Sequence, residues 1–331
     1  MATGKLLRQL IKSGIEGNMD AFRVASEKII KEERQKQHHL LANDLERLLY
    51  GRPRDLDRLP RPLLERVPVD RERNLALLDL REPVRRIDDA VLSDETRSAV
   101  EELLQEHHHR EALTAYGLRP ADRLLFYGPP GCGKTLTAEV IASELGLPLA
   151  VVRVDAVVSS YLGETAANLR KVFDFASANE LVVLFDEFDG LAKERADEAE
   201  HGELRRVVNA VLQMMDAYTG RSVLIAATNH EAMLDSAIWR RFEEVLLFEP
   251  PNLEQLRRLL RLKLRGVRRE FEVDDATVTA LFKGMPHADV ERVLRRAIKD
   301  MVLAGQEFLT VRHLEAAARR ERPRQVQQRR K

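Results

Sequence analysis

The residues with the clearest chemical potential form one stretch, Gly128-Pro129-Pro130-Gly131-Cys132-Gly133-Lys134-Thr135, followed by Leu136. It matches the pattern G-x-x-x-x-G-K-[ST] and lies between an apolar run typical of a strand and a helical stretch. In such a loop, backbone N–H groups and the helix N-terminus face phosphate oxygens. Lys134 adds a charge for the β- and γ-phosphates, and Thr135 an oxygen for Mg²⁺. The stretch therefore predicts a site for ATP and Mg²⁺, the alternative being a plain glycine-rich turn.

Two carboxylates follow a second apolar run, Leu181-Val-Val-Leu-Phe-Asp186-Glu187. A buried strand that ends in this way carries its acids to the carboxyl edge of a parallel sheet, beside the phosphate loop. We expect Asp186 to hold Mg²⁺ through water and Glu187 to polarise the attacking water as a general base. The alternative is a pair of acids that face solvent.

Two more polar groups follow strand-like or helical segments. The amide of Asn229, after Leu224-Ile-Ala-Ala-Thr228, can orient a water between Glu187 and the γ-phosphate. Arg240 and Arg241 precede Phe242, and an arginine pair in this setting is commonly ordinary surface charge.

Composition excludes several classes of protein. The 331 residues include 54 basic and 54 acidic side chains, so a polyanion-binding protein with charge spread over the whole chain is disfavoured. A 44% apolar content argues against intrinsic disorder. The single cysteine excludes an intramolecular disulfide framework and is consistent with a reducing cytosol. We find no secretion signal and no apolar run long enough for a transmembrane helix, so we expect a cytoplasmic protein that does not engage a membrane.

The chain divides into zones of different patterning. Residues 1–50 show apolar residues at helical spacing and predict a helical hairpin or three-helix module. Residues 51–85 hold five of the 13 prolines and predict a linker, or an extended segment along a neighbouring surface. Residues 251–318 predict a small helical domain, and residues 319–331, with seven basic side chains and one acid, a disordered basic tail.

Between these zones, residues 86–250 alternate short apolar runs with helical stretches. The expected strands are Leu124–Tyr127, Leu149–Val154, Leu181–Phe185, Val223–Ala227 and Val245–Phe248. Strands that alternate with helices, and that lack polar alternation, indicate an α/β fold with a parallel sheet covered on both faces.

Taken together, the motifs GPPGCGKT, LVVLFDE, AATN and DSAIWRRF resemble those of the AAA family of ATPases, in order and spacing, over roughly residues 86–318. The resemblance is to bacterial-type members that form a single ring. It implies a phosphate-loop sheet with strand order 5-1-4-3-2, a small all-α lid, a homo-oligomeric ring that is usually a hexamer, and hydrolysis of ATP at the interfaces between subunits.

The resemblance also assigns roles to individual residues. Asn229 corresponds to the first sensor, and Arg240 and Arg241 to arginine fingers that reach the γ-phosphate of a neighbouring subunit, although the common family form separates the two by Pro-Gly. Lid residues His287 and Ala288, where the family usually reads Gly-Ala, and upstream residues Ala90 and Val91 correspond to contacts with the adenosine part. For His287 the alternative is a cap of the following helix.

A further match is Ser160-Tyr161-Leu162-Gly163-Glu164, which resembles the first pore loop of the family. There, rings of an aromatic and an apolar side chain, here Tyr161 and Leu162, grip an extended polypeptide. An aromatic side chain provides grip without reading sequence. The alternative is a loop tyrosine that is packed or exposed.

The favoured hypothesis is a ring motor that remodels, unfolds or threads a protein substrate. Residues 1–85 would select the substrate or dock a partner such as a protease or another effector. A remodeller of nucleic acids is the second hypothesis, because of the basic tail, and an ATP-gated assembly switch for an effector is the third.

The single cysteine and a run of three histidines could also suggest reactive sites. The first interpretation of Cys132 is a small residue that fits the phosphate loop. A helix N-terminus can also lower the pKa of a thiol, so we expect alkylation of Cys132 to be prevented by nucleotide and to block hydrolysis. His107, His108 and His109 cannot all face one point on a helix, and we expect a solvated face there.

Overall fold

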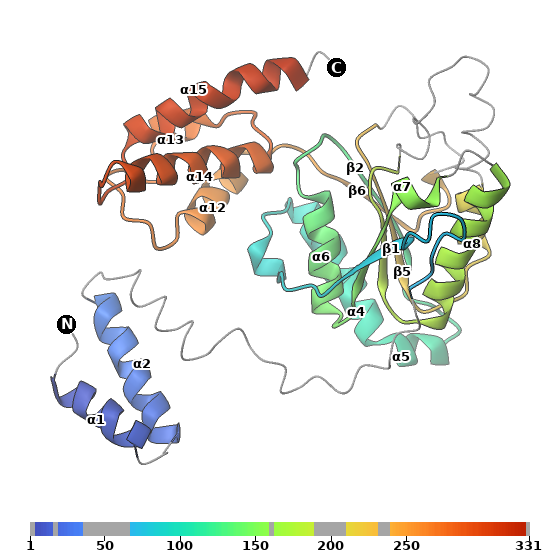
Figure 1. Ribbon diagram of the computed structural model, residues 1–331, viewed down its shortest axis with the longest axis horizontal. Helices are drawn as coiled ribbons and strands as arrows, with labels where there is room; N and C mark the ends of the chain where they lie inside the picture. The colour runs from blue at the N-terminus through green and yellow to red at the C-terminus, as the bar shows by residue number, and fades with distance from the viewer. Residues whose placement is uncertain are drawn as a thin grey trace. The chain divides into compact units, whose positions relative to one another are not determined.

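The computed structural model describes residues 4–15, 19–35, 67–158, 162–188, 210–230 and 239–328 (Figure 1). Its helices are α1 (Gly4–Ile15), α2 (Met19–Gln35), η1 (Ile87–Asp89), α4 (Asp94–His108), α5 (Arg110–Ala115), α6 (Lys134–Glu144), α7 (Val154–Val157), α8 (Leu162–Ala178), α12 (Leu253–Lys263), α13 (Ala276–Leu281), α14 (His287–Leu303) and α15 (Val311–Gln328). Its strands are β1 (Leu78–Arg81), β2 (Arg123–Tyr127), β3 (Leu149–Val152), β4 (Val182–Phe185), β5 (Val223–Thr228) and β6 (Glu244–Leu247).

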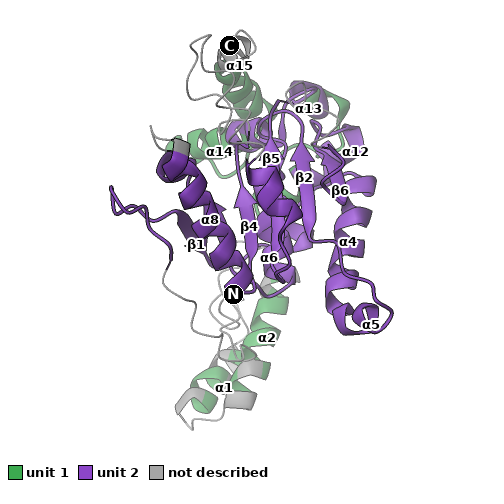
Figure 2. Cartoon of the chain, turned by 90° about the vertical axis from the view of Figure 1, so that its right-hand side faces the viewer, with its two compact units in different colours: residues 1–62, 260–278, 294–331 green, residues 63–259, 279–293 purple. Residues whose placement is uncertain are grey.

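The chain forms two compact units (Figure 2). One contains residues 63–259 and 279–293, and the other contains residues 1–62, 260–278 and 294–331. The first turns of α14 thus belong to the unit that holds the sheet. A backbone hydrogen bond explains this, since the N–H of Ala288 donates to the carbonyl of Gly131 at 3.0 Å.

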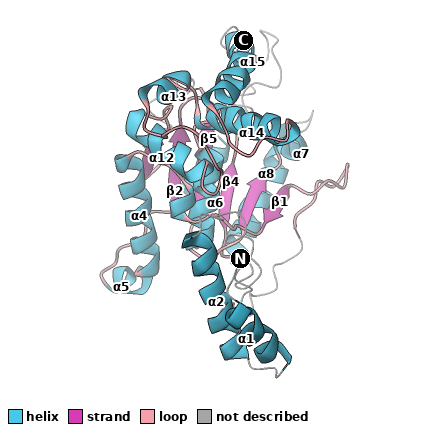
Figure 3. Cartoon of the chain, turned by 90° about the vertical axis from the view of Figure 1, so that its left-hand side faces the viewer, coloured by secondary structure: helices cyan, strands magenta, loops and turns pink. Residues whose placement is uncertain are grey.

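The six strands form one sheet in the order β1-β3-β4-β5-β2-β6. Figure 3 shows this sheet, with β1, β4, β5 and β2 labelled. Five of the strands are parallel neighbours, at the five places where the apolar runs predicted strands. Numbered from the strand before the phosphate loop, these five run 5-1-4-3-2, as predicted. The sheet differs from the prediction by β1, which pairs antiparallel with β3.

Strand β1 corrects the predicted linker. Residues 78–81 lie within the proline-rich stretch 51–85, yet they pair with β3 from Leu78↔Val152 to Arg81↔Leu149. Leu77 and Leu78 are buried beside β3, and this apolar pair accounts for the pairing. Residues 51–66 of this stretch lie outside the described residues. In the described part, proline spacing disfavours a long helix, but it says nothing against a short edge strand between Pro68 and Pro83.

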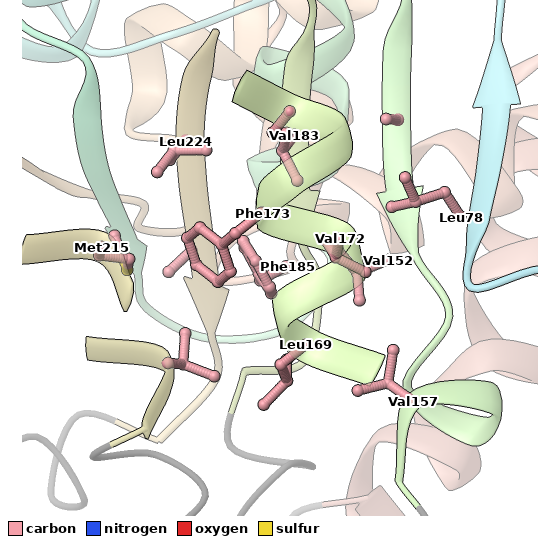
Figure 4. Close-up of a cluster of buried hydrophobic side chains, with 14 of the residues drawn as sticks. Leu78, Val152, Val157, Leu169, Val172, Phe173, Val183, Phe185, Met215 and Leu224 are labelled. Carbon is pink, nitrogen blue, oxygen red and sulfur yellow. The ribbon is translucent and has the colours of Figure 1, made fainter. Parts of the chain in front are cut away.

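Both faces of the sheet are buried, because successive residues of the central strands point to opposite sides. On one side, Val183 and Phe185 of β4 pack in a cluster with α8 residues that include Leu169, Val172 and Phe173 (Figure 4). On the other side, Val182 and Leu184 pack in a cluster with residues of α4 and α6. The sheet therefore lies between two layers of helices. This packing fixes the strands relative to one another, and with them the residues that follow their carboxyl ends.

The predicted disordered tail is helical over most of its length. Helix α15 runs from Val311 to Gln328. Glu321 is 1% exposed and pairs with Arg296 of α14 at 3.4 Å, and Arg320 pairs with Asp300 at 3.6 Å. These ion pairs connect the two helices and explain why the basic composition does not prevent folding.

At the other end of the chain, α1 and α2 lie where the apolar spacing predicted helices. The break at Gly17-Asn18 and the third helical stretch, up to Tyr50, fall outside the described residues. No helix in the described parts of the chain is both long and apolar enough to cross a membrane.

Candidate nucleotide site

The phosphate loop joins β2 to α6, and its first glycine is required by close packing. Gly128 has φ +129°, and a Cβ there would collide with the carbonyl oxygen of Phe248. Phe248 is held in place because its N–H donates to the carbonyl of Tyr127 at 2.8 Å. The residue after β6 therefore supports the loop from behind, a contact that the motif alone does not indicate.

Lys134 is the first residue of α6 and is 7% exposed. Its ammonium group donates to the carbonyls of Gly128 at 2.6 Å and Pro129 at 3.0 Å. The charge thus lies inside the curve of the loop, where a bound phosphate would meet it.

Thr135 and Asp186 come together as predicted. The Thr135 hydroxyl donates to Oδ2 of Asp186 at 2.8 Å, although the two residues are 51 positions apart in sequence. Register causes this, because β2 and β4 flank β5 in parallel and both end at the same edge. A hydroxyl and a carboxylate are the hard oxygen ligands that Mg²⁺ takes from protein when phosphates and water complete its shell.

Glu187 adopts a left-handed backbone conformation with φ +50°. Its N–H donates to Oδ1 of Asp186 at 3.0 Å, and the next N–H, of Phe188, donates to the carbonyl of Ala227 at 2.8 Å. A left-handed glutamate is sterically unfavourable by roughly 1–2 kcal/mol. These bonds maintain the conformation, and the Glu187 side chain remains exposed beside Asp186. Backbone strain of this kind is concentrated at functional sites.

Asn229 directly follows β5, the strand between β2 and β4. Thr228 pairs in register with Tyr127, the last residue before the phosphate loop. The buried Thr228 hydroxyl accepts the N–H of His230 at 3.1 Å, which turns the chain at this point. Asn229 therefore emerges at the same sheet edge as Lys134 and Asp186.

The lid segment reaches the phosphate loop through α14. Besides the bond from the Ala288 N–H, a Cβ on Gly131 would lie 3.1 Å from the Cβ of Ala288. Glycine suits this position, because a side chain would be strained at φ +76° and would crowd Ala288. The resemblance to the AAA family implied a contact role for Ala288, but not its pairing with Gly131.

His287 lies at the start of α14 with both ring nitrogens buried and unpaired within the described residues. Burial lowers the pKa of His287 to about 4, and the neighbouring backbone of Val91 opposes this shift only in part. The imidazole is therefore neutral at physiological pH. The structure brings His287 close to Val91, which, like Ala90, is buried. A helix cap is the weaker interpretation, because no ring nitrogen accepts from a described backbone N–H.

The two arginines near β6 differ in their surroundings. Nε of Arg241 lies 2.8 Å from Oδ2 of Asp216, a residue that sequence analysis did not single out. Arg240 is exposed and makes no ion pair with any residue in the described ranges. Trp239 packs edge-on against Tyr127, with ring centroids 4.9 Å apart, and so attaches this segment to β2.

The candidate pore residues are described only in part. Leu162 begins α8, whereas Tyr161 lies outside the described residues. Helix α8 follows α7 and β3, so its N-terminus lies toward the carboxyl edge of the sheet.

The structure contradicts the lowered thiol pKa expected for Cys132 and agrees with a small residue that fits the loop. The side chain is 3% exposed, and burial raises the pKa of Cys132 to about 11, against a smaller lowering by Lys134. Proximity to a helix N-terminus does not overcome the cost of placing a thiolate among apolar side chains of the α4–α6 face.

We therefore expect iodoacetamide to alkylate Cys132 at least roughly 10-fold more slowly in the folded protein than in the unfolded chain at pH 8, because little thiolate is present. Cys132 is the only cysteine, so intact-mass spectrometry with and without denaturant reports this site directly. Equal rates in the two states would contradict the buried, protonated thiol.

The expectation for the histidine run also needs correction. His108 and His109 are exposed, but His107 is half-buried, and its Nε2 lies 2.8 Å from the carbonyl oxygen of Ala121. Desolvation lowers the pKa of His107. No group of three or more His, Cys, Asp or Glu side chains within the described ranges is arranged to hold a metal ion.

Comparison with known proteins agrees with this geometry. Residues 124–250 match the family model described as ATPase family associated with various cellular activities (AAA). The chain is 41% identical over 328 residues to the Uncharacterized AAA family ATPase y4kL of Sinorhizobium fredii, covering 99% of this chain and 98% of that protein. It is 34% identical over 194 residues to the ATPase family gene 2 protein of Schizosaccharomyces pombe, covering 57% of this chain and 24% of that protein.

Proposed function

The chain belongs to the AAA family and hydrolyses ATP, and from this premise we propose that it is a ring-forming motor that pulls on a protein substrate. The observation that carries the proposal is the contrast between Arg241, which is bound to Asp216 of its own chain, and the exposed Arg240. The Arg240 guanidinium makes no ion pair with a described residue of its own chain. It is therefore suited to bind the γ-phosphate of a nucleotide held by a neighbouring subunit.

Within one subunit, the roles follow from position. Lys134 would exchange its two loop carbonyls for phosphate oxygens, and Thr135 with Asp186 would hold Mg²⁺. When bound, Mg²⁺ supplies positive charge that offsets the developing charge on the phosphates. Glu187 would take the proton from the attacking water, and Asn229 would orient that water.

The adenosine part would lie between His287 and the segment with Ala90 and Val91. A neutral imidazole with two unpaired nitrogens can donate one hydrogen bond and accept another. Leaving both unsatisfied in a buried position is unfavourable, and a bound nucleoside would relieve this cost.

The substrate contact is assigned to Tyr161 and Leu162. An aromatic and an apolar side chain at the entrance to α8 would hold an extended polypeptide without regard to its sequence. Force on α8 passes to the sheet, because its residues Leu169, Val172 and Phe173 pack on β4 in the cluster of Figure 4.

An unfolded polypeptide such as casein is therefore expected to raise the rate of ATP hydrolysis, and Tyr161→Ala is expected to remove this stimulation while basal hydrolysis persists. Phosphate release measured with and without casein tests this. Val84→Ala, at an exposed position outside the site, is the matched control. If DNA rather than casein raised the rate of ATP hydrolysis, and if added salt reduced this effect, the nucleic-acid hypothesis would be favoured.

The remaining assignments concern partners. We propose a homo-oligomer, with six subunits as in most family members, because a finger supplied from a neighbour needs a closed set of interfaces. Residues 1–85 would dock the substrate or an effector such as a protease. Arg319 and Arg320 pair with acids of their own unit, at 3.9 Å to Glu315 and 3.6 Å to Asp300, which leaves less charge for a nucleic acid.

A further inference from the structure

Residues 239–243, which contain both arginines and lead into β6, are attached near both ends of β2. Successive residues of a strand point to opposite faces, so Arg123 and Tyr127 share a face of β2. Trp239 packs against the Tyr127 ring, at the carboxyl end of the strand. At the other end, the N–H of Glu243 donates to the carbonyl of Arg123 at 2.9 Å. The segment is therefore held at its first residue and at its last.

Two contacts hold the segment between these ends. Phe242 is 6% exposed and belongs to the apolar cluster on the side of the sheet that α8 covers. Arg241 is paired with Asp216, in the helical stretch 210–216. Arg240 is exposed and makes no ion pair with the part of the chain that the structure describes. Its backbone consequently has restrained neighbours on both sides, whereas its side chain is turned to the surface.

The carboxylate of Glu243 fixes the end of the segment. Its Oε2 accepts the N–H groups of Asp122 at 2.7 Å and Arg123 at 3.2 Å. Its Oε1 accepts the Arg123 guanidinium at 2.7 Å. One oxygen is thus bound by the backbone at the start of β2, and the other by a side chain of the same strand.

The charges around this carboxylate favour its ionised form. Burial alone would raise the pKa of Glu243, but hydrogen bonds from the Arg123 side chain and the Asp122 N–H lower it overall. For Asp122 the balance is the opposite, because burial and repulsion from Glu243 raise its pKa to about 6. Arg123 lies between the two acids, 2.7 Å from Glu243 and 3.3 Å from Asp122. Glu243 is therefore the acid that binds Arg123 more closely.

The contacts of the segment restrain it to different degrees. Burial of Phe242 is non-directional. The exposed ion pair of Arg241 with Asp216 is weak. The bonds to Glu243 are charge-assisted and directional, and two of them come from backbone groups that are fixed by the sheet. Glu243 therefore contributes most to the direction in which the chain passes Arg240.

We propose that Glu243 is a positioning residue for Arg240, holding residues 239–243 on β2 so that the Arg240 guanidinium meets the γ-phosphate of a neighbouring subunit at a fixed place. Arg123 is its partner in this role, and both act through the segment and not on the phosphate. The inference rests on the proposed function, because it takes Arg240 as the arginine finger. It also connects the finger to the nucleotide site of its own subunit, since β2 begins at Arg123 and leads into the phosphate loop at Gly128.

The test uses Glu243→Gln in the full-length chain. An amide oxygen can accept from the backbone N–H groups or from Arg123, but not from both, because the other end of the amide donates. Glu243→Asp keeps the charge and shortens the side chain. Glu244→Gln is the matched control, because Glu244 is the next residue and, besides burial, only other acids act on its carboxyl group: Glu102, Glu106 and Glu243.

Folding of the variants is measured by thermal unfolding. The side chains of Glu243 and Arg123 are 38% and 26% exposed, so their ion pair is not deeply buried. We expect the melting temperatures of all three variants to stay within a few degrees of that of the unsubstituted chain.

In the activity arm, we expect Glu243→Gln to lower kcat for ATP about 10-fold with ATP affinity within about two-fold, since a small displacement of a catalytic group has effects of this size or larger. Glu243→Asp should fall between, and Glu244→Gln should match the unsubstituted chain. An unchanged kcat, in a chain that Arg240→Ala inactivates, would overturn the inference.

A double substitution distinguishes positioning from a general structural role. Once Arg240 is replaced by alanine, Glu243 has no guanidinium left to position. Adding Glu243→Gln to Arg240→Ala should therefore leave the residual rate, measured at high enzyme concentration, unchanged within about two-fold. A further loss as large as that in the unsubstituted background would overturn the inference.

A structural arm does not depend on the finger. Trp239 is the only tryptophan of the chain, so its fluorescence reports this segment directly. Without nucleotide, acrylamide should quench this fluorescence more strongly in Glu243→Gln than in the unsubstituted chain, and Glu244→Gln should leave quenching unchanged. If Arg240→Ala keeps full hydrolysis but quenching rises with Glu243→Gln, the finger assignment fails and the positioning of the segment stands. Unchanged quenching would overturn the positioning role whatever the rates are.

Discussion

Glu187→Gln is expected to lower the rate of ATP hydrolysis by ~10²–10⁴-fold and to leave ATP affinity nearly unchanged. The reason is that an amide has the size of the carboxylate but cannot take a proton from water. The structure supports a selective effect, because the Glu187 side chain is exposed and its backbone, at φ +50°, is held by bonds from the N–H groups of Glu187 and Phe188. None of these bonds involves the side chain that is replaced.

Phosphate release and binding of a fluorescent ATP analogue measure the two quantities separately. Glu187→Asp is the matched control, because it keeps the carboxylate, tolerates a left-handed backbone and shortens the reach by one methylene. We expect it to hydrolyse ATP faster than Glu187→Gln and more slowly than the unsubstituted chain. Rapid hydrolysis by Glu187→Gln would exclude Glu187 as the base, and lost ATP binding would assign it a structural role.

The same variant separates two hypotheses of function. A motor that must turn over is inactive with Glu187→Gln, yet it should hold its substrate when ATP is present. Affinity capture with this variant in ATP is then expected to retain the substrate. An assembly switch, in which ATP binding is sufficient, would keep its function with the same substitution.

Arg240→Ala is expected to reduce hydrolysis by ~10³–10⁵-fold, the range for a residue that completes a phosphoryl-transfer site from a neighbouring subunit. Arg241→Ala should cost much less, at most about 10-fold, because Arg241 is bound to Asp216 in an exposed ion pair worth roughly 0.2–1 kcal/mol. Hydrolysis rates at saturating ATP measure both effects. A larger loss for Arg241→Ala would reverse the assignment of the finger.

Mixed assemblies test whether Arg240 acts on a neighbour. A subunit with Arg240→Ala retains its own phosphate loop, and a subunit with Lys134→Ala, which should not bind nucleotide, retains its own Arg240. Together they are expected to recover part of the activity that each lacks alone. Mixing Lys134→Ala with Glu187→Gln is the control, since neither subunit then has a complete site. No recovery in any mixture of the first pair would argue against the ring.

Much of the nucleotide site could be predicted from sequence, because its parts lie where local patterns are strong. The phosphate loop, the acids after β4 and the polar exit of β5 each follow a buried apolar strand. Parallel register then brings strand ends to one edge without any further information. The pairing of Thr135 with Asp186 at 2.8 Å follows from this rule.

Sequence by itself therefore determined the class of the sheet, the position of the phosphate loop and the identity of the acids, since these depend on periodicity and local turns. Contacts between distant segments were decided only by tertiary structure, because they depend on which side chains folding brings together. Asp216 holds one of two adjacent arginines, burial raises the pKa of Cys132, and β1 joins the sheet from a proline-rich stretch. Two further contacts of this kind are the bond from Arg73 to the carbonyl of Ala156 in α7 and the bond from Asn168 of α8 to the buried Asp70. A local sequence pattern predicts neither of them.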